Sequence, residues 1–167
     1  APGATHAPHH PTKEWVDKIT AMKLFDEGWN KVAEKIFENQ KRLGVIPANA
    51  KLPPWPDKLL PRWETLNADQ KRLYLRQINV WAAYMAYVDA EIGRVIDTLD
   101  QLGQLDNTLI IWVAGDNGMS AEGSLNGTPN EVGYFNGVAF TVEQMLPLIP
   151  VWGTSRTYNH FAVPWAF

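Results

Sequence analysis

The sequence predicts an α/β fold in which a long helix packs on a central sheet that is only partly present in this chain. Two observations carry this prediction. An apolar stripe recurs at helical spacing over residues 67–102, and a solid apolar run rich in β-branched side chains follows over residues 108–114. Such a run is typical of a strand buried on both faces of a parallel sheet. Because only one convincing central strand is present, we expect most of the sheet to come from elsewhere.

The first half of the chain, residues 1–66, is predicted to be helical and proline-rich. Thr12 is a suitable N-cap for a short helix, and Asp26 is a suitable N-cap for a second one. Apolar side chains over residues 29–43 share one face of that second helix, and Gly44 stands where a helix-ending glycine belongs. Five prolines then exclude regular structure over about residues 46–62.

The second half, residues 67–167, is predicted to contain a helix, the strand and a metal-binding loop. Asn67 begins the long helix and Gly103 ends it, so the helix would span roughly 54 Å. From Gly115 onward, glycine, asparagine, serine and proline indicate turns. Four tryptophans occur at the apolar positions of the predicted helices and strand and are interpreted as packing residues: Trp15, Trp29, Trp81 and Trp112.

The composition excludes several classes of protein. With 167 residues, 46% hydrophobic and 20% charged, the chain is suited to a single folded domain rather than to a disordered, collagen-like or coiled-coil protein. A net charge of −3 argues against a nucleic-acid partner, and no apolar stretch is long enough to predict a membrane span. Cysteine is absent, which excludes a disulfide, a thiolate metal site and a cysteine nucleophile within the chain.

The two ends of the sequence predict an internal segment of a longer protein. The first residues have neither a starting methionine nor the charged and apolar regions of a signal peptide. The last residues are an apolar run without a polar tail. We therefore expect part of any functional site to lie outside the chain.

The first candidate site is the pair Asp116 and Asn117, which follows the predicted strand. Ligands of open α/β sheets bind at the carboxyl ends of the strands. A carboxylate and an amide oxygen are hard donors that suit Ca²⁺ or Mg²⁺, and the flanking glycines let the backbone turn closely. The alternative interpretation of these residues is a turn that ends the strand.

The second candidate is a histidine cluster, His6, His9 and His10, placed among prolines. Fixed imidazoles can bind an anion, donate a proton to a leaving group or bind a metal, although no carboxylate stands nearby at ligand spacing. A solvated histidine-rich loop is the alternative. His160, in a polar and aromatic loop, is a further candidate for substrate contact.

Taken in order, these segments resemble the sulfatases of the alkaline-phosphatase-like superfamily, and specifically the bacterial arylsulfatases. The similar segments are Ala-Pro-His-His-Pro at 7–11, Glu-Ile-Gly-Arg-Val-Ile at 91–96, Leu-Asp-Asn-Thr at 105–108, Asp-Asn-Gly at 116–118 and Ala-Glu-Gly at 121–123. The resemblance covers essentially the whole chain. It implies a partial alkaline-phosphatase-like fold and identifies the chain as an internal segment of a catalytic domain.

The resemblance also implies roles for three residues. Asp116 and Asn117 match two ligands of the family's Ca²⁺, and His9 matches the histidine beside the sulfate ester. The family's nucleophile is a formylglycine made within a Cys/Ser-x-Pro-x-Arg motif, which this chain lacks. We therefore expect the nucleophile to lie outside the chain and the isolated chain to be inactive. The partners implied are a small-molecule sulfate ester and the remainder of the same catalytic domain, with neither nucleic acid nor membrane.

Two other functions remain open from the sequence. A phosphonate or phosphate diester hydrolase of the same superfamily commonly has histidine after the metal-binding aspartate, whereas Asn117 offers only a hard oxygen. A non-catalytic, aromatic-rich binding module is the alternative from another class, and it would need exposed tryptophans.

Overall fold

The computed structural model describes residues 6–113 and 119–167, which are helical and irregular. The α-helices are α1 (Lys13–Ala21), α2 (Trp29–Arg42), α3 (Ala68–Gln101), α4 (Glu131–Phe135) and α5 (Val142–Met145). Short 3₁₀ helices are η1 (Trp63–Thr65), η2 (Leu105–Asn107), η3 (Leu146–Val151) and η4 (Val163–Ala166). Among the described residues, none of the helices combines the length and apolar character needed to cross a membrane.

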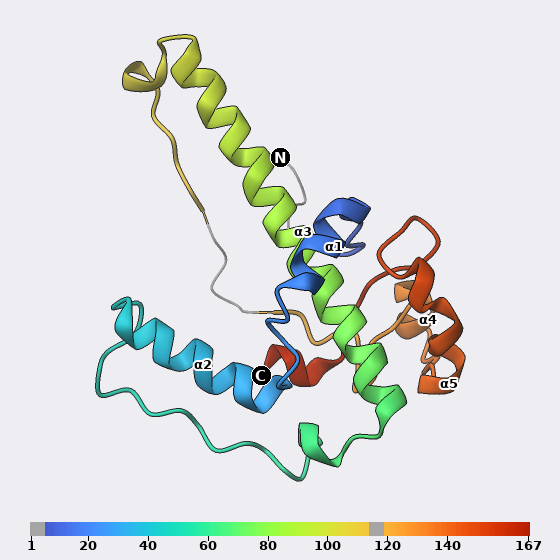
Figure 1. Ribbon diagram of the computed structural model, residues 1–167. Helices are drawn as coiled ribbons and strands as arrows, with labels where there is room; N and C mark the ends of the chain where they lie inside the picture. Colours follow the sequence, from blue (N-terminus) through green and yellow to red (C-terminus); the bar gives the residue numbers. More distant parts are fainter. Residues whose placement is uncertain (1–5, 114–118) are drawn as a thin grey trace.

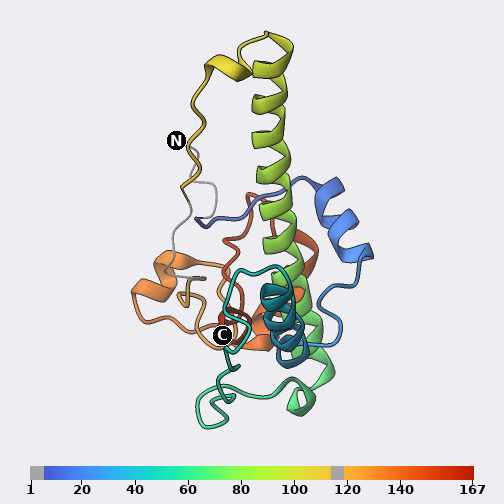
Figure 2. The ribbon, with the colours of Figure 1, turned by 90° about the vertical axis from the view of Figure 1, so that its left-hand side faces the viewer.

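The long helix α3 is the axis of the molecule (Figure 1). Asn67 caps it as predicted, because its side chain accepts from the Gln70 backbone N–H while the Gln70 side chain accepts from the Asn67 N–H. Gly103, with φ +64°, follows its end. Apart from η2 at its far end, the other elements gather around its first half, and its second half projects from the body in both views (Figures 1 and 2).

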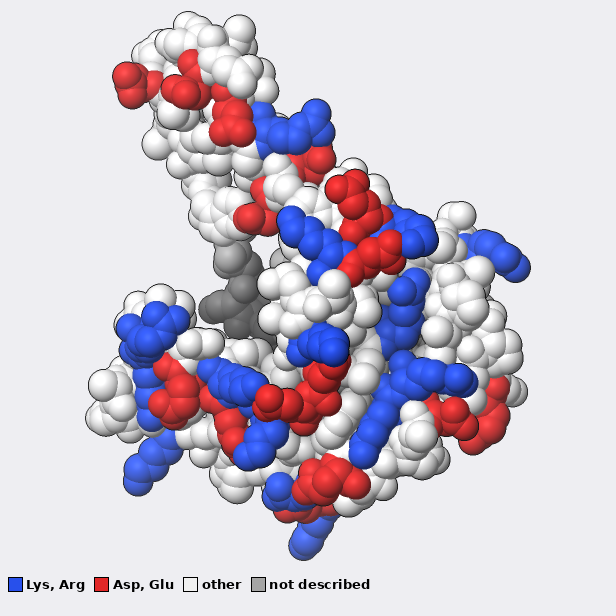
Figure 3. Space-filling view, viewed as in Figure 1, with Lys and Arg blue, Asp and Glu red and all other residues white. Residues whose placement is uncertain are grey.

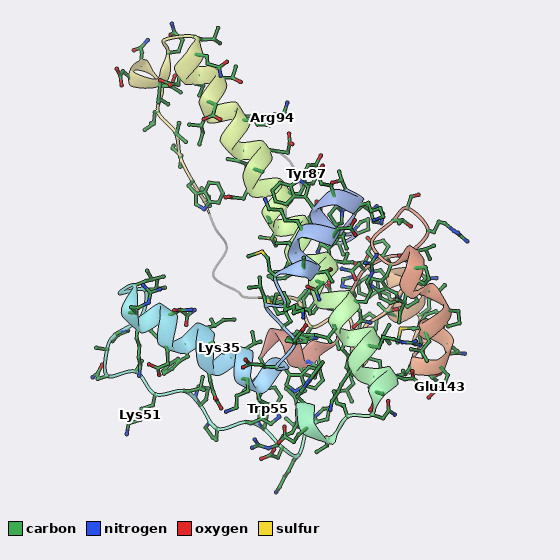
Figure 4. The ribbon with its side chains drawn as sticks, viewed as in Figure 1. Lys35, Lys51, Trp55, Tyr87, Arg94 and Glu143 are labelled. Atoms are coloured by element: carbon green, nitrogen blue, oxygen red, sulfur yellow. The ribbon has the colours of Figure 1, made fainter. Side chains whose placement is uncertain are left out.

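The point at which α3 leaves the body is marked by Tyr87. The ring of Trp15 on α1 lies 6.3 Å from the Tyr87 ring, and Figure 4 shows Tyr87 beside α1. Farther along, Arg94 points into open space and pairs with Glu91 of the same helix, at 2.6 Å. The last fully buried residue of α3 is Ala83. The apolar stripe predicted over residues 67–102 is therefore fully buried only in its first half, and Val95 and Leu102 in its second half are exposed.

The core at the base of α3 is an aromatic cluster. Trp29 contacts three rings, those of Trp63, Tyr74 and Trp165, at centroid distances of 4.9, 5.7 and 5.5 Å. Each ring comes from a different element, so the cluster joins α2, η1, α3 and η4. The Trp29 indole also donates to the Pro61 carbonyl oxygen at 3.0 Å, which fastens the proline-rich segment to α2. That segment has no regular helix or strand, as predicted.

The helix ends are confirmed with one exception. Thr12 caps α1, and Gly44 with φ +72° follows α2. Asp26 was predicted as the second N-cap, but α2 begins at Trp29 with Gly28 as its N-cap. Gly28 has φ +81°, and a Cβ there would lie 1.9 Å from the Cγ of Trp63. The Trp63 ring therefore leaves no room for a side chain at this N-cap, a constraint that capping preference alone does not predict.

The predicted strand at 108–114 is wrong over residues 108–113, which form neither strand nor helix, and residue 114 lies outside the described residues. These apolar side chains are exposed rather than covered by α3, and Trp112, predicted to be a packing residue, is 65% exposed. A strand of a parallel sheet is held by neighbouring strands on both sides. No described residue supplies such a neighbour, so the sheet of the predicted α/β fold is not seen.

Charged side chains are mixed over the visible face of the molecule. Figure 3 shows lysine and arginine interspersed with aspartate and glutamate over α1, α2 and the first half of α3. Several form exposed pairs, such as Lys31 with Glu34 at 2.8 Å and Lys35 with Glu27 at 2.8 Å. Exposed pairs of this kind contribute little to stability. This face has no large patch of a single sign.

Candidate functional site

His9 is the buried member of the histidine cluster, with 3% of its surface exposed, whereas His6 and His10 are exposed. Its ring packs against Tyr84 of α3 at a centroid distance of 5.3 Å and is stacked on Phe161 at 6.4 Å. The Nδ1 atom lies 2.7 Å from the backbone carbonyl oxygen of Asn159. The imidazole is thus held by the C-terminal segment of the chain as well as by its neighbouring prolines.

The contact with Asn159 determines which nitrogen of His9 carries the proton. A carbonyl oxygen can only accept, so Nδ1–H must donate to it. The Asn159 side-chain amide nitrogen also lies 3.4 Å from Nδ1, but a protonated Nδ1 cannot accept from it. A neutral His9 therefore has no proton on Nε2, and Nε2 becomes a donor only when the ring is protonated.

Asn159 is itself fixed in place. It is fully buried, and its side-chain oxygen accepts from the indole N–H of Trp152. The loop that bears both residues is closed by Thr157, whose hydroxyl donates to the Val151 carbonyl at 3.0 Å and accepts from the Gly153 N–H at 3.2 Å. His10 adds a contact to the same loop, with Nε2 3.0 Å from the Thr157 carbonyl oxygen. The segment around His9 and the loop 151–161 therefore form one unit.

Gln77 connects this unit to α3. It is fully buried, its amide nitrogen donates to the Asn126 carbonyl at 2.9 Å, and its oxygen accepts from the Ala162 N–H at 3.0 Å. A Cβ on Gly127 would lie 2.3 Å from the same amide nitrogen, so the chain passes very close to Gln77 there. One buried polar side chain of the helix thus positions the loops on both sides of the candidate site.

Asp116 and Asn117, the predicted metal ligands, lie outside the described residues. Met119, the first described residue after them, packs against the hydrophobic core. The role of the pair as metal ligands therefore stays a prediction.

A second group of side chains comes together where sequence analysis did not predict a site. The ligand atoms of Glu122, Glu131 and His160 all lie within 4.8 Å of one another. His160 was a candidate for substrate contact, and its Nε2 in fact lies 3.1 Å from a carboxylate oxygen of Glu131. Glu131 had no signal in the sequence, because 29 residues separate it from His160 and no local spacing connects them.

The ionisation of Glu131 and that of Tyr158 are linked. Burial raises the pKa of the Glu131 carboxyl, but hydrogen bonds from Tyr158 and His160 outweigh it and hold the pKa below its ordinary value. Burial and the same hydrogen bond to Glu131 raise the pKa of the Tyr158 hydroxyl to about 12. The carboxylate is therefore ionised and the phenol is protonated at neutral pH.

The tryptophans are mostly used for packing. Four are buried, Trp29, Trp63, Trp152 and Trp165. Three more, Trp15, Trp55 and Trp81, are partly buried against the core, and only Trp112 is mainly exposed. This distribution does not provide the exposed tryptophans that the alternative, a non-catalytic binding module, would need.

Comparison with known proteins matches residues 1–141 to the protein family described as Sulfatase. An uncharacterized sulfatase of Schizosaccharomyces pombe is 36% identical over 122 residues, covering 73% of this chain and 21% of the relative. An arylsulfatase of Klebsiella aerogenes is 30% identical over 120 residues, covering 70% of this chain and 25% of the relative. The matched region is thus between a fifth and a quarter of the length of these relatives.

Proposed function

The chain belongs to the sulfatase family, and from this premise we propose that the complete protein is a sulfuric ester hydrolase of the arylsulfatase type. The family implies an alkaline-phosphatase-like fold and the hydrolysis of small-molecule sulfate esters. The similarity to an arylsulfatase over 70% of the chain supports the narrower assignment. Because the match spans only a quarter of that relative, the activity is proposed for the complete protein.

The observation that carries the proposal for this chain is the burial and fixation of His9. We propose that His9 contacts the sulfate ester and that Nε2 of its protonated form donates a hydrogen bond to it. Its Nδ1–H is held by the Asn159 carbonyl at 2.7 Å, so the ring cannot rotate freely when the substrate binds. An imidazolium held in this position would bind an anionic ester and could protonate its leaving oxygen.

Asp116 and Asn117 are proposed to hold Ca²⁺. Their donor atoms are a carboxylate oxygen and an amide oxygen, which are hard ligands that fit calcium and offer no nitrogen or sulfur. When bound, Ca²⁺ supplies positive charge that offsets the charge on the sulfate oxygens. The same donor set favours the sulfatase assignment over the phosphonate or phosphate diester hydrolase alternative.

The covalent nucleophile is proposed to lie outside the chain. No Cys/Ser-x-Pro-x-Arg motif is present, so the formylglycine of the family would come from the rest of the catalytic domain. The described residues place His9 beside the residues that hold its ring, but they bring no such nucleophile to it. The 167-residue chain by itself is therefore proposed to be inactive.

The rest of the same catalytic domain is the proposed partner of the exposed apolar surface. Side chains 109–113 are between 48% and 86% exposed, and Val95 and Leu102 of the projecting helix are 63% and 66% exposed. An apolar surface of this kind marks an interaction site. In the complete domain, further strands and helices would cover it.

The test is the activity of the complete protein on three chromogenic substrates that share one leaving group: an aryl sulfate, an aryl phosphate diester and an aryl phosphonate. We expect kcat/KM to be highest for the sulfate. A preference for the diester or the phosphonate would favour the alternative hydrolase. The absence of turnover of all three, in protein shown to contain formylglycine and calcium, would overturn the proposal.

A further inference from the structure

Glu122, Glu131 and His160 form a compact group that the proposed function does not use. Their ligand atoms lie within 4.8 Å of one another. The side chains of His160 and Glu131 are 4% and 15% exposed, and Glu122 is partly exposed. His160 is therefore buried, whereas Glu131 and Glu122 are both partly exposed.

The backbone holds this group together across distant parts of the chain. Thr128 and His160 form an isolated antiparallel bridge, with N–H donating to carbonyl oxygen in both directions at 3.0 and 3.2 Å. Asn130 caps α4, so Glu131 occupies the first position of that helix next to the bridge. Gly123 lies so close to the same segment that a Cβ would be 2.1 Å from the Phe161 carbonyl oxygen. Three segments are thus pressed together around the group.

We propose that Glu122, Glu131 and His160 bind a divalent transition-metal ion, with Zn²⁺ as the best fit. Two carboxylate oxygens and one imidazole nitrogen are three of the ligands that zinc takes in proteins, and water completes its coordination. The imidazole disfavours calcium, which prefers oxygen ligands only. The site therefore differs in metal preference from the all-oxygen pair Asp116 and Asn117, and it stands independently of the proposed sulfatase activity.

Binding requires only small changes in the group. Zinc ligands lie about 2.0–2.2 Å from the metal, so the side chains must close in from their present spacing. Glu122 is partly exposed and its oxygen is held by the Ser120 hydroxyl at 2.8 Å, so it can rotate toward the other two at small cost. For zinc to bind, the Nε2 atom of His160, now 3.1 Å from Glu131, must be unprotonated, so the ring keeps one proton on Nδ1 and any second proton goes to solvent. The ion would then connect the loop at 122, helix α4 and the segment at 160.

The experiment is a calorimetric titration of the complete protein with Zn²⁺ in the presence of excess Ca²⁺, which occupies all-oxygen sites. Glu122→Gln is the main variant, because it removes a ligand and leaves the His160–Glu131 pair intact. Glu131→Gln is the second variant, and Glu143→Gln on α5 is the matched control at an exposed carboxylate. Melting temperatures without zinc show whether each variant is folded.

We expect one zinc site whose affinity falls at least about tenfold in Glu122→Gln and in Glu131→Gln, while Glu143→Gln binds like the unmodified protein. Zinc should also raise the melting temperature of the unmodified protein more than that of Glu122→Gln. Unchanged zinc affinity in both ligand variants would place the metal elsewhere and overturn the proposal. The absence of zinc binding in the unmodified protein would show that the group is an ion pair only, which overturns it equally.

Discussion

The Nδ1 atom of His9 lies 2.7 Å from the backbone carbonyl oxygen of Asn159, a residue 150 positions later in the chain. Asn159 in turn is held by the Trp152 indole. The orientation of the His9 ring and the position of its proton thus depend on the segment around Asn159, which the fold places next to the N-terminal part of the chain. Because the acceptor is a backbone oxygen, replacing the Asn159 side chain would leave this bond possible but remove its support.

The first prediction concerns His9 and its neighbour His10. We expect His9→Ala in the complete protein to lower kcat/KM for an aryl sulfate by roughly 10²–10⁴-fold, because it removes the proposed proton donor. Calcium binding should stay unchanged. His10→Ala is the control, since His10 is exposed and its loss removes one contact with the Thr157 carbonyl but no proposed proton donor, so it should lower kcat/KM much less. Equal losses in the two variants, measured by steady-state kinetics, would contradict the role assigned to His9.

The second prediction concerns the proposed calcium ligands. Asp116→Ala should abolish calcium binding and activity together, because a carboxylate supplies most of the attraction for a hard cation. Asn117→Ala should weaken binding less, since it removes a neutral oxygen. Asp106→Ala, at an exposed aspartate of η2, is the control and should bind calcium normally. Calorimetry that finds full calcium affinity in Asp116→Ala would show that the metal has other ligands.

The elements that sequence predicts well are those with local signals. The capping box of Asn67 and Gln70 and the cap at Thr12 are made by residues three apart, so they are visible in the sequence and present in the structure. The failed strand at 108–113 has the opposite character. Its apolar run predicts burial, but the burial needs neighbouring strands that the described part of the chain does not supply. Asp26 failed as a cap because α2 begins at Trp29, after Gly28, and the Trp63 ring that packs on Gly28 comes from a distant part of the sequence.

The same distinction applies to the candidate site. His9 could be selected from its motif, and the structure shows that it is the buried histidine of its cluster. Its partner Asn159 could not be selected, because only the tertiary fold brings 9 and 159 together. The group of Glu122, Glu131 and His160 likewise depends on the bridge between Thr128 and His160, which has no local pattern.

The third prediction tests the packing of Trp63 on Gly28. Gly28→Ala should destabilise the protein by about 3 kcal/mol or more, because it adds overpacking to a strained positive φ. Gly44→Ala is the matched control, since Gly44 has φ +72° but open space around its Cα, and its cost should be about 1 kcal/mol. Denaturant unfolding measures both. Equal costs would mean that the Trp63 ring moves aside freely.

The fourth prediction concerns the pH dependence of stability. The pKa of Glu131 in the folded protein lies below its ordinary value of 4.5, because the hydrogen bonds from Tyr158 and His160 outweigh burial. Its contribution is therefore present above about pH 4.5 and is lost as pH falls through the lower, folded pKa. The difference in melting temperature between the unmodified protein and Glu131→Gln should be large at pH 6 and shrink toward pH 3. A difference that stays constant over this range would contradict the assignment.

The last prediction concerns residues 109–113. Their amides make no hydrogen bond to another described residue, and their side chains face solvent, although the run has the composition of a buried strand. If the rest of the catalytic domain supplies neighbouring strands, these amides become hydrogen-bonded and shielded from water. Hydrogen exchange should then be slow at 109–113 in the complete protein and fast in the 167-residue chain alone. The α3 amides over 73–83, on the part of the helix that carries its buried residues, are the internal control and should be protected in both. Fast exchange at 109–113 in the complete protein would mean that the apolar run is not a strand of the sheet, and the surface it forms would need a different partner.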